Sequence, residues 1–80
     1  MVDIKKLLGK LTPKEKLTAI EIINLIIRKD TKGLDVKKLK GEDRVYRVRK
    51  GKIRVIYQLL ENAPRLLFVG RRSDNTYRKL

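Results

Sequence analysis

The chain has 80 residues, a net charge of +13 at pH 7, and neither cysteine nor histidine. A chain this short makes one domain with a modest core, here taken as residues 1–80. The absence of cysteine excludes a disulfide framework and a zinc knuckle. The absence of histidine removes the commonest acid–base residue near neutral pH and a common metal ligand, so no cofactor is expected. An excess of positive charge this large favours a polyanionic partner, above all nucleic acid.

The distribution of charge and hydropathy along the chain indicates where the protein acts and which half contacts its partner. The first segment, MVDIKKLLGKL, is too charged for a secretory signal, and no apolar run reaches the length of a membrane span. We therefore expect a cytoplasmic protein without a membrane partner. Residues 1–39 hold 10 basic and 5 acidic side chains, whereas residues 40–80 hold 12 and 4, so the net charge rises from +5 to +8. The second half is the expected contact surface.

Residues 1–33 carry the signals of a helical hairpin. Ile4, Leu7, Leu8 and Leu11 follow helical spacing, with Asp3 as a candidate cap. The segment TPKE then marks a second helix start: Thr12 fits the N-cap, Pro13 the first helical position, and Glu15 a capping box. The apolar pattern continues to about Lys29 and is expected to stop before Gly33.

The periodicity changes to strands over residues 44–72. RVYRVRK and KIRVIYQLL alternate with period two, and RLLFVG is almost entirely apolar, as in a buried central strand. Pro64 and Gly70 bound that last strand, and residues 73–80 form a polar tail. The pattern predicts an α+β fold in which an N-terminal helical hairpin packs on one face of an antiparallel β-sheet meander.

The hairpin VYRVRKGKIRVIY carries five cations and no acid. With Lys50 and Gly51 as a two-residue turn, one face would hold the core residues Tyr46, Val48, Ile53, Val55 and Tyr57. The other face would hold Val45, Arg47, Arg49, Lys52, Arg54 and Ile56. Facing like charges destabilise a sheet by roughly 0.2–1 kcal/mol per pair, so folding alone does not explain them. The phosphate groups of a ligand would explain these cations, because each cation would then have a partner. A solvated basic surface is the alternative.

The chemistry available to such a face is narrow. Arg, Lys and Tyr can stabilise the charge of a phosphorane-like transition state, but they are poor proton carriers at neutral pH. A serine–histidine or cysteine–histidine pair is impossible, and a two-carboxylate metal site is not expected. A catalyst of this composition would depend on positioning the substrate.

The ordered set KKLKG, VYRVRKGKIRVIY, LLFVGRR and TY resembles the RelE toxins of bacterial and archaeal toxin–antitoxin pairs, over roughly Val36 to Tyr77. The resemblance implies a toxin of the RelE/ParE superfamily that cleaves messenger RNA in the ribosomal A site without metal, by attack of a ribose 2′-hydroxyl. It also implies an acidic, RelB-like antitoxin, with the ribosome and mRNA as further partners.

The resemblance also assigns site residues. Arg47 and Arg49 match strand cations of which one is usually a lysine acting as base, Arg54 a phosphate contact, Arg72 an acid or transition-state stabiliser, and Tyr77 a base-stacking tyrosine. The expected catalytic set is therefore Arg47, Arg49, Arg54, Arg72 and Tyr77, and the expected substrate-binding set is Lys50, Lys52, Arg71 and Arg78.

Two departures from the family pattern keep alternatives open. Arg49 stands where lysine is usual, and guanidinium is the weaker base. The family's first strand is also not evident before the first helix. A gyrase inhibitor of the ParE type, and a homologue that only binds RNA or an antitoxin, are the competing hypotheses.

Overall fold

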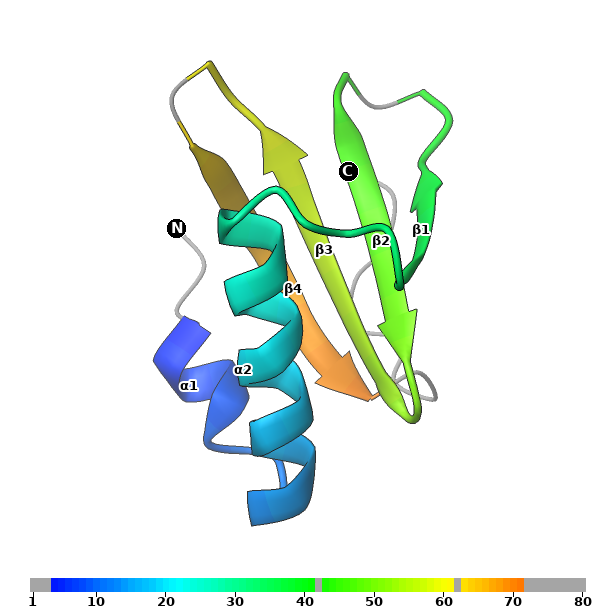
Figure 1. Cartoon of the computed structure of the whole chain (residues 1–80). Coiled ribbons are helices and arrows are strands. Elements are labelled where there is room, and N and C mark those ends of the chain that lie inside the picture. Colours follow the sequence, from blue (N-terminus) through cyan, green and yellow to red (C-terminus); the bar gives the residue numbers. More distant parts are fainter. Residues whose placement is uncertain (1–3, 42, 62, 72–80) are drawn as a thin grey trace.

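The computed structural model describes residues 4–41, 43–61 and 63–71, which form two helices and four strands. In chain order these are α1 (Ile4–Leu8), α2 (Pro13–Ile27), β1 (Asp35–Lys38), β2 (Val45–Lys50), β3 (Ile53–Leu59) and β4 (Pro64–Arg71). The strands form one antiparallel sheet in the order β1-β2-β3-β4, with α2 across one face and α1 packed against the edge strand β4 (Figure 1). The predicted α+β arrangement is confirmed at this level. No helix in the described ranges has the length and apolar character needed to cross a membrane.

The ends of α2 show how local chemistry sets a helix. Thr12 and Glu15 form the predicted capping box: Glu15 N donates to Thr12 Oγ1 over 3.2 Å, and Thr12 N donates to Glu15 Oε1 over 2.9 Å. The helix ends at Ile27, two residues before the predicted position. Lys29 takes the left-handed conformation with φ of 60°, while its N–H and that of Asp30 bond back to the last turn. This is a Schellman motif, and lysine occupies the position where glycine is usual.

The sequence interpretation missed strand β1. Asp35–Lys38 pairs antiparallel with β2, so the sheet begins well before the predicted residue 44. Its four residues are too short to produce a clear alternation, and its ladder depends on hydrogen bonds from β2. The outer edge of this strand carries Asp35, Lys37 and Lys38, charged side chains that typically discourage further strand pairing.

The β2–β3 hairpin has the predicted faces but a different turn. Lys50 pairs with Ile53, so the loop is Gly51–Lys52 rather than Lys50–Gly51. Gly51 has φ of 57°, and glycine with positive φ at the first loop position suits a type II′ turn. Because both loops contain two residues, the parity of the faces is unchanged. The facing pairs do change: Arg49, not Arg47, lies opposite Arg54.

Strand β4 is an edge strand, which corrects the prediction of a central one. It is nevertheless apolar because both of its faces are covered, with Val69 in the helix-side core and Phe68 in a second cluster. Helix α1 packs against this strand, and Leu7 contacts both clusters. Pro64 opens the strand, a position where the missing N–H is tolerated. A register shift after Ile56 leaves Leu67 without a facing residue, as in a β-bulge.

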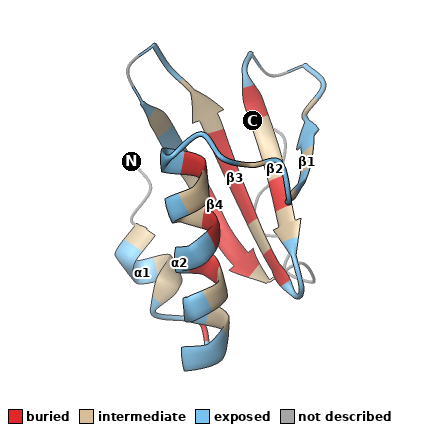
Figure 2. Ribbon diagram, viewed as in Figure 1, coloured by how far each residue is buried: buried red, intermediate tan, exposed pale blue. Residues whose placement is uncertain are grey.

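Buried residues form two clusters, one on each face of the sheet (Figure 2). The larger one, between the helices and the sheet, contains Leu11, Ala19, Ile22, Ile26, Val48, Ile53, Val55, Tyr57 and Val69. The predicted burial is therefore confirmed for Val48, Ile53, Val55 and Tyr57, whereas Tyr46 is only half-buried. The smaller cluster, Val45, Ile56 and Phe68, lies on the face that the sequence had predicted to be open.

Candidate functional site: a cationic face of the sheet

The sheet face away from α2 carries Arg47, Arg49 and Arg54, which we call the arginine face. Directly opposite residues of antiparallel strands share a face, so the register defines two rows across the sheet. The first row is Asp35, Arg49, Arg54 and Gly70; the second is Lys37, Arg47, Ile56 and Phe68. The predicted alternation is confirmed for the three arginines.

The arginines are half-buried rather than fully solvated. Arg47 faces Ile56 across the strands and lies two residues from Val45, so its aliphatic stem borders the small apolar cluster. The Nε–H groups of Arg49 and Arg54 are covered and donate no hydrogen bond to any described residue. A phosphate approaching from solvent would therefore meet the terminal Nη groups first. Packing of the stems restricts the side chains before a ligand arrives, which lowers the entropy lost on binding.

Opposite charge on this face is limited. Arg49 Nη2 lies 3.4 Å from Asp35 Oδ2, and the Arg49 side chain retains 31% of its exposure. Arg54 forms no hydrogen bond or ion pair with any residue that the structure describes. The facing pair Arg49 and Arg54 thus keeps most of its repulsion, since an exposed ion pair contributes only about 0–1 kcal/mol. An anionic ligand would relieve this repulsion.

Two cations predicted to bind substrate contact α2 instead. Lys50 Nζ lies 2.7 Å from Glu21 Oε1. Arg71 forms a two-point ion pair with Glu15, Nη2 to Oε1 over 2.9 Å and Nε to Oε2 over 3.0 Å, which ties the end of β4 to the capping box of α2. Hydrogen bonds from the Thr12 backbone N–H and from Arg71 hold the pKa of the Glu15 carboxyl below its ordinary value.

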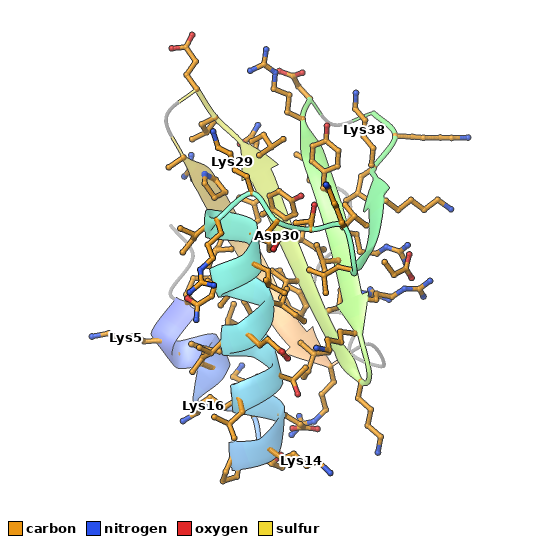
Figure 3. All side chains as sticks on the ribbon, in the orientation of Figure 1. Lys5, Lys14, Lys16, Lys29, Asp30 and Lys38 are labelled. Carbon is orange, nitrogen blue, oxygen red and sulfur yellow. The ribbon has the colours of Figure 1, made fainter. Side chains whose placement is uncertain are left out.

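Lys52 lies at the tip of the hairpin, in a hollow of about 480 Å³ that it lines together with Thr12, Lys14 and Thr18. The lysines of the helix layer, among them Lys5, Lys14 and Lys16, project outward in several directions (Figure 3). The helix-side cations therefore do not share a surface with the three arginines. Arg72, Tyr77 and Arg78, the remaining predicted site residues, lie outside the described residues.

The register adds two residues that sequence reasoning did not include. Asp35 and Lys37, both exposed, lie on the arginine face opposite Arg49 and Arg47. The sequence signal for this strand was weak. It consists of the apolar residues Leu34 and Val36 alternating with Asp35 and Lys37, and in the structure the two apolar residues pack against the main core. A pattern of this length does not distinguish a strand from a loop.

A second feature lies on the helix side of the sheet. The rings of Tyr46 and Tyr57 stack with centroids 5.6 Å apart and planes inclined by 23°. Burial, and then the neighbouring Tyr46, raises the pKa of the Tyr57 hydroxyl above its ordinary value. Both rings line a hollow of about 510 Å³ together with Lys29 and Arg44. The tyrosine pair is thus separated from the arginine face by the sheet itself.

Comparison of the chain with models of known families, with curated proteins and with solved structures found no match. In the described part of the chain no three acidic residues gather as a metal ligand set. What the arginine face offers is a half-buried group of guanidinium donors, which suits phosphate oxygens.

Proposed function

We propose that the protein is a RelE-type toxin that binds messenger RNA through the arginine face and cleaves it on the ribosome, without metal. The observation that carries the proposal is the grouping of Arg47, Arg49 and Arg54 on one sheet face, at the positions the resemblance assigns to substrate contact. Folding gains nothing from the facing pair Arg49 and Arg54. Binding to an RNA backbone would give both arginines a phosphate partner.

In the proposed reaction the 2′-hydroxyl oxygen of one nucleotide attacks the adjacent phosphorus, and the bond to the 5′-oxygen of the next nucleotide breaks. The products are a 2′,3′-cyclic phosphate and a free 5′-hydroxyl. The arginines would stabilise the additional negative charge on the phosphorane oxygens. Because the reacting groups must be held in line, the ribosome would supply the positioning that an 80-residue protein does not. By resemblance, Arg72 would assist the leaving oxygen and Tyr77 would stack on a base.

An RNA-binding protein without catalysis is the second candidate, and one observation favours it. Lys50 contacts Glu21 and Lys52 lies at the hairpin tip, so neither ammonium belongs to the arginine face. Guanidinium groups are weak proton acceptors. A protein with only such groups would hold RNA or an antitoxin without cutting.

The proposed partner in the cell is an acidic, partly helical antitoxin that covers the arginine face. Attraction to a chain of net charge +13 would speed its association, and salt would slow it. An acidic protein recovered with the chain from its native host, encoded beside it, is the expected finding.

The test is inducible expression followed by primer extension on a translated message. The proposal expects cuts in phase with codons, and their loss when Arg47, Arg49 and Arg54 are all changed to alanine. The matched control changes Lys5, Lys14 and Lys16 to alanine, which removes the same charge from the helix layer and should leave the cuts in place (Figure 3). Growth arrest without cuts would support the binding protein, and DNA damage without cuts would support a gyrase inhibitor.

A further inference from the structure

Asp35 is the only acidic residue in the four strands of the sheet, all of which the structure describes. It lies at the end of the row that continues with Arg49 and Arg54, on the arginine face. Its Oδ2 is 3.4 Å from Arg49 Nη2, and its side chain keeps 59% of its exposure. A carboxylate is therefore held by one guanidinium beside a second, and it remains open to a ligand.

The proposed cleavage needs a group to accept the proton of the attacking hydroxyl. Guanidinium groups stay protonated at neutral pH and cannot do this. A carboxylate can, and a positioned general base typically contributes about 10²- to 10⁴-fold to a rate. The row places the acceptor beside Arg49, with Arg54 on the next strand, so the acceptor and the two donors that would hold the phosphate share one face.

We infer that Asp35 is the general base of the proposed reaction, and this inference rests on that proposed function. The Asp35 carboxylate takes the proton from the 2′-hydroxyl as its oxygen forms the bond to phosphorus. The electron pair of the breaking bond leaves with the 5′-oxygen, which takes a proton from water. Arg49 orients Asp35 through the ion pair, and Arg54 holds a phosphate oxygen. Asp35 is thus a catalytic residue, and Arg49 has a positioning role as well as a binding one.

Two other roles predict different behaviour. If Asp35 only neutralises Arg49, removing its charge should strengthen RNA binding and leave cleavage equal or faster. If Lys37, which faces Arg47 on the same strand, is the base, cleavage should depend on Lys37 instead. Among the residues that the structure describes, the charged side chains sharing this face with Asp35 are Lys37 on its own strand, Arg47 and Arg49 on β2, and Arg54 on β3.

The experiment measures single-turnover cleavage of a ribosome-bound message, and binding of an uncleavable 2′-deoxy analogue, for the parent, Asp35→Asn, Asp35→Glu and Lys37→Met. The expected result for Asp35→Asn is a rate at least about 100-fold lower with binding unchanged or tighter. Asp35→Glu keeps a carboxylate at this position and should retain more of the parent rate than Asp35→Asn does. Asp30→Asn removes an exposed acid at the end of α2 and should cleave at the parent rate.

The outcomes separate the two proposals. A parent that binds but does not cleave overturns the proposed function, and the role of Asp35 with it. A parent that cleaves while Asp35→Asn cleaves equally well overturns only the role of Asp35, and a loss confined to Lys37→Met transfers that role to Lys37. Because asparagine has the shape of aspartate and the position is exposed, circular dichroism and the melting temperature of Asp35→Asn should match those of the parent.

Discussion

Gly70 is the described glycine at which an added methyl group would meet a buried side chain most closely. It lies opposite Arg54 in the first row, and the ring of Phe68 lies across it. A Cβ atom at Gly70 would stand 2.5 Å from Phe68 Cζ and 3.0 Å from Cε2. Phe68 is only 5% exposed and packs with Val45 and Ile56, so its ring has little room to move aside.

Two opposing effects set the size of the change in Gly70→Ala. Alanine restricts the unfolded chain and should stabilise a strand by about 0.5–1 kcal/mol relative to glycine. Overpacking of a buried site costs about 1–3 kcal/mol. The clash distances place this site in the overpacked class, so the free energy of unfolding should fall by roughly 0–2.5 kcal/mol once the gain is subtracted from the cost. For a domain of this size, each 1 kcal/mol lowers the melting temperature by about 4–8 °C.

Urea denaturation of four proteins tests this reasoning: the parent, Gly70→Ala, Phe68→Leu and the double variant. Leucine lacks the clashing ring atoms, so Gly70→Ala should cost less free energy of unfolding in the Phe68→Leu background than in the parent. The difference between the two costs should exceed roughly 0.5 kcal/mol, the deviation from additivity that independent sites show. Gly33→Ala is the control, because nothing lies within 4 Å of a Cβ there, and it should be neutral or slightly stabilising. Equal costs of Gly70→Ala in the parent and in the Phe68→Leu background would refute the clash.

Further predictions concern stability and RNA binding. Lys29→Gly should raise the free energy of unfolding by about 0.5–1 kcal/mol in urea titrations, because glycine takes the positive φ without strain; Arg28→Gly, at a residue with φ of −77°, should lower it. The pKa of the Glu15 carboxyl is lower in the folded protein than in the unfolded chain. The ionised carboxylate therefore stabilises the fold at any pH above its pKa in the unfolded chain, and this contribution is lost as the pH falls through its pKa in the folded protein. The urea midpoint of Glu15→Gln should thus lie below that of the parent at pH 7 and meet it in acid. In titrations of single-stranded RNA, Arg54→Ala should weaken binding and reduce the slope of log affinity against log salt by about 0.7, whereas Lys50→Ala should leave the slope unchanged.

The sequence by itself determined the features that depend on near neighbours. The capping box at Thr12 and Glu15 is encoded within four residues, and the structure contains it. The alternation in β2 and β3 determined that Arg47, Arg49 and Arg54 share the face away from the helices, because side chains of a strand point to opposite sides in turn. The α+β class followed from the change of period between the two halves of the chain.

Only the tertiary structure decided which residues meet across the sheet. The loop of the hairpin could be placed at Lys50–Gly51 or Gly51–Lys52 with the same faces, and packing selected the second. Arg71 and Lys50 look like further members of a basic surface until their contacts with Glu15 and Glu21 appear. Asp35 reaches the arginine face only because β1 pairs with β2, and that pairing joins residues 14 apart through hydrogen bonds that no local pattern encodes. A four-residue edge strand has too little side-chain burial of its own to leave a periodic signal, so its position is fixed by the strand beside it.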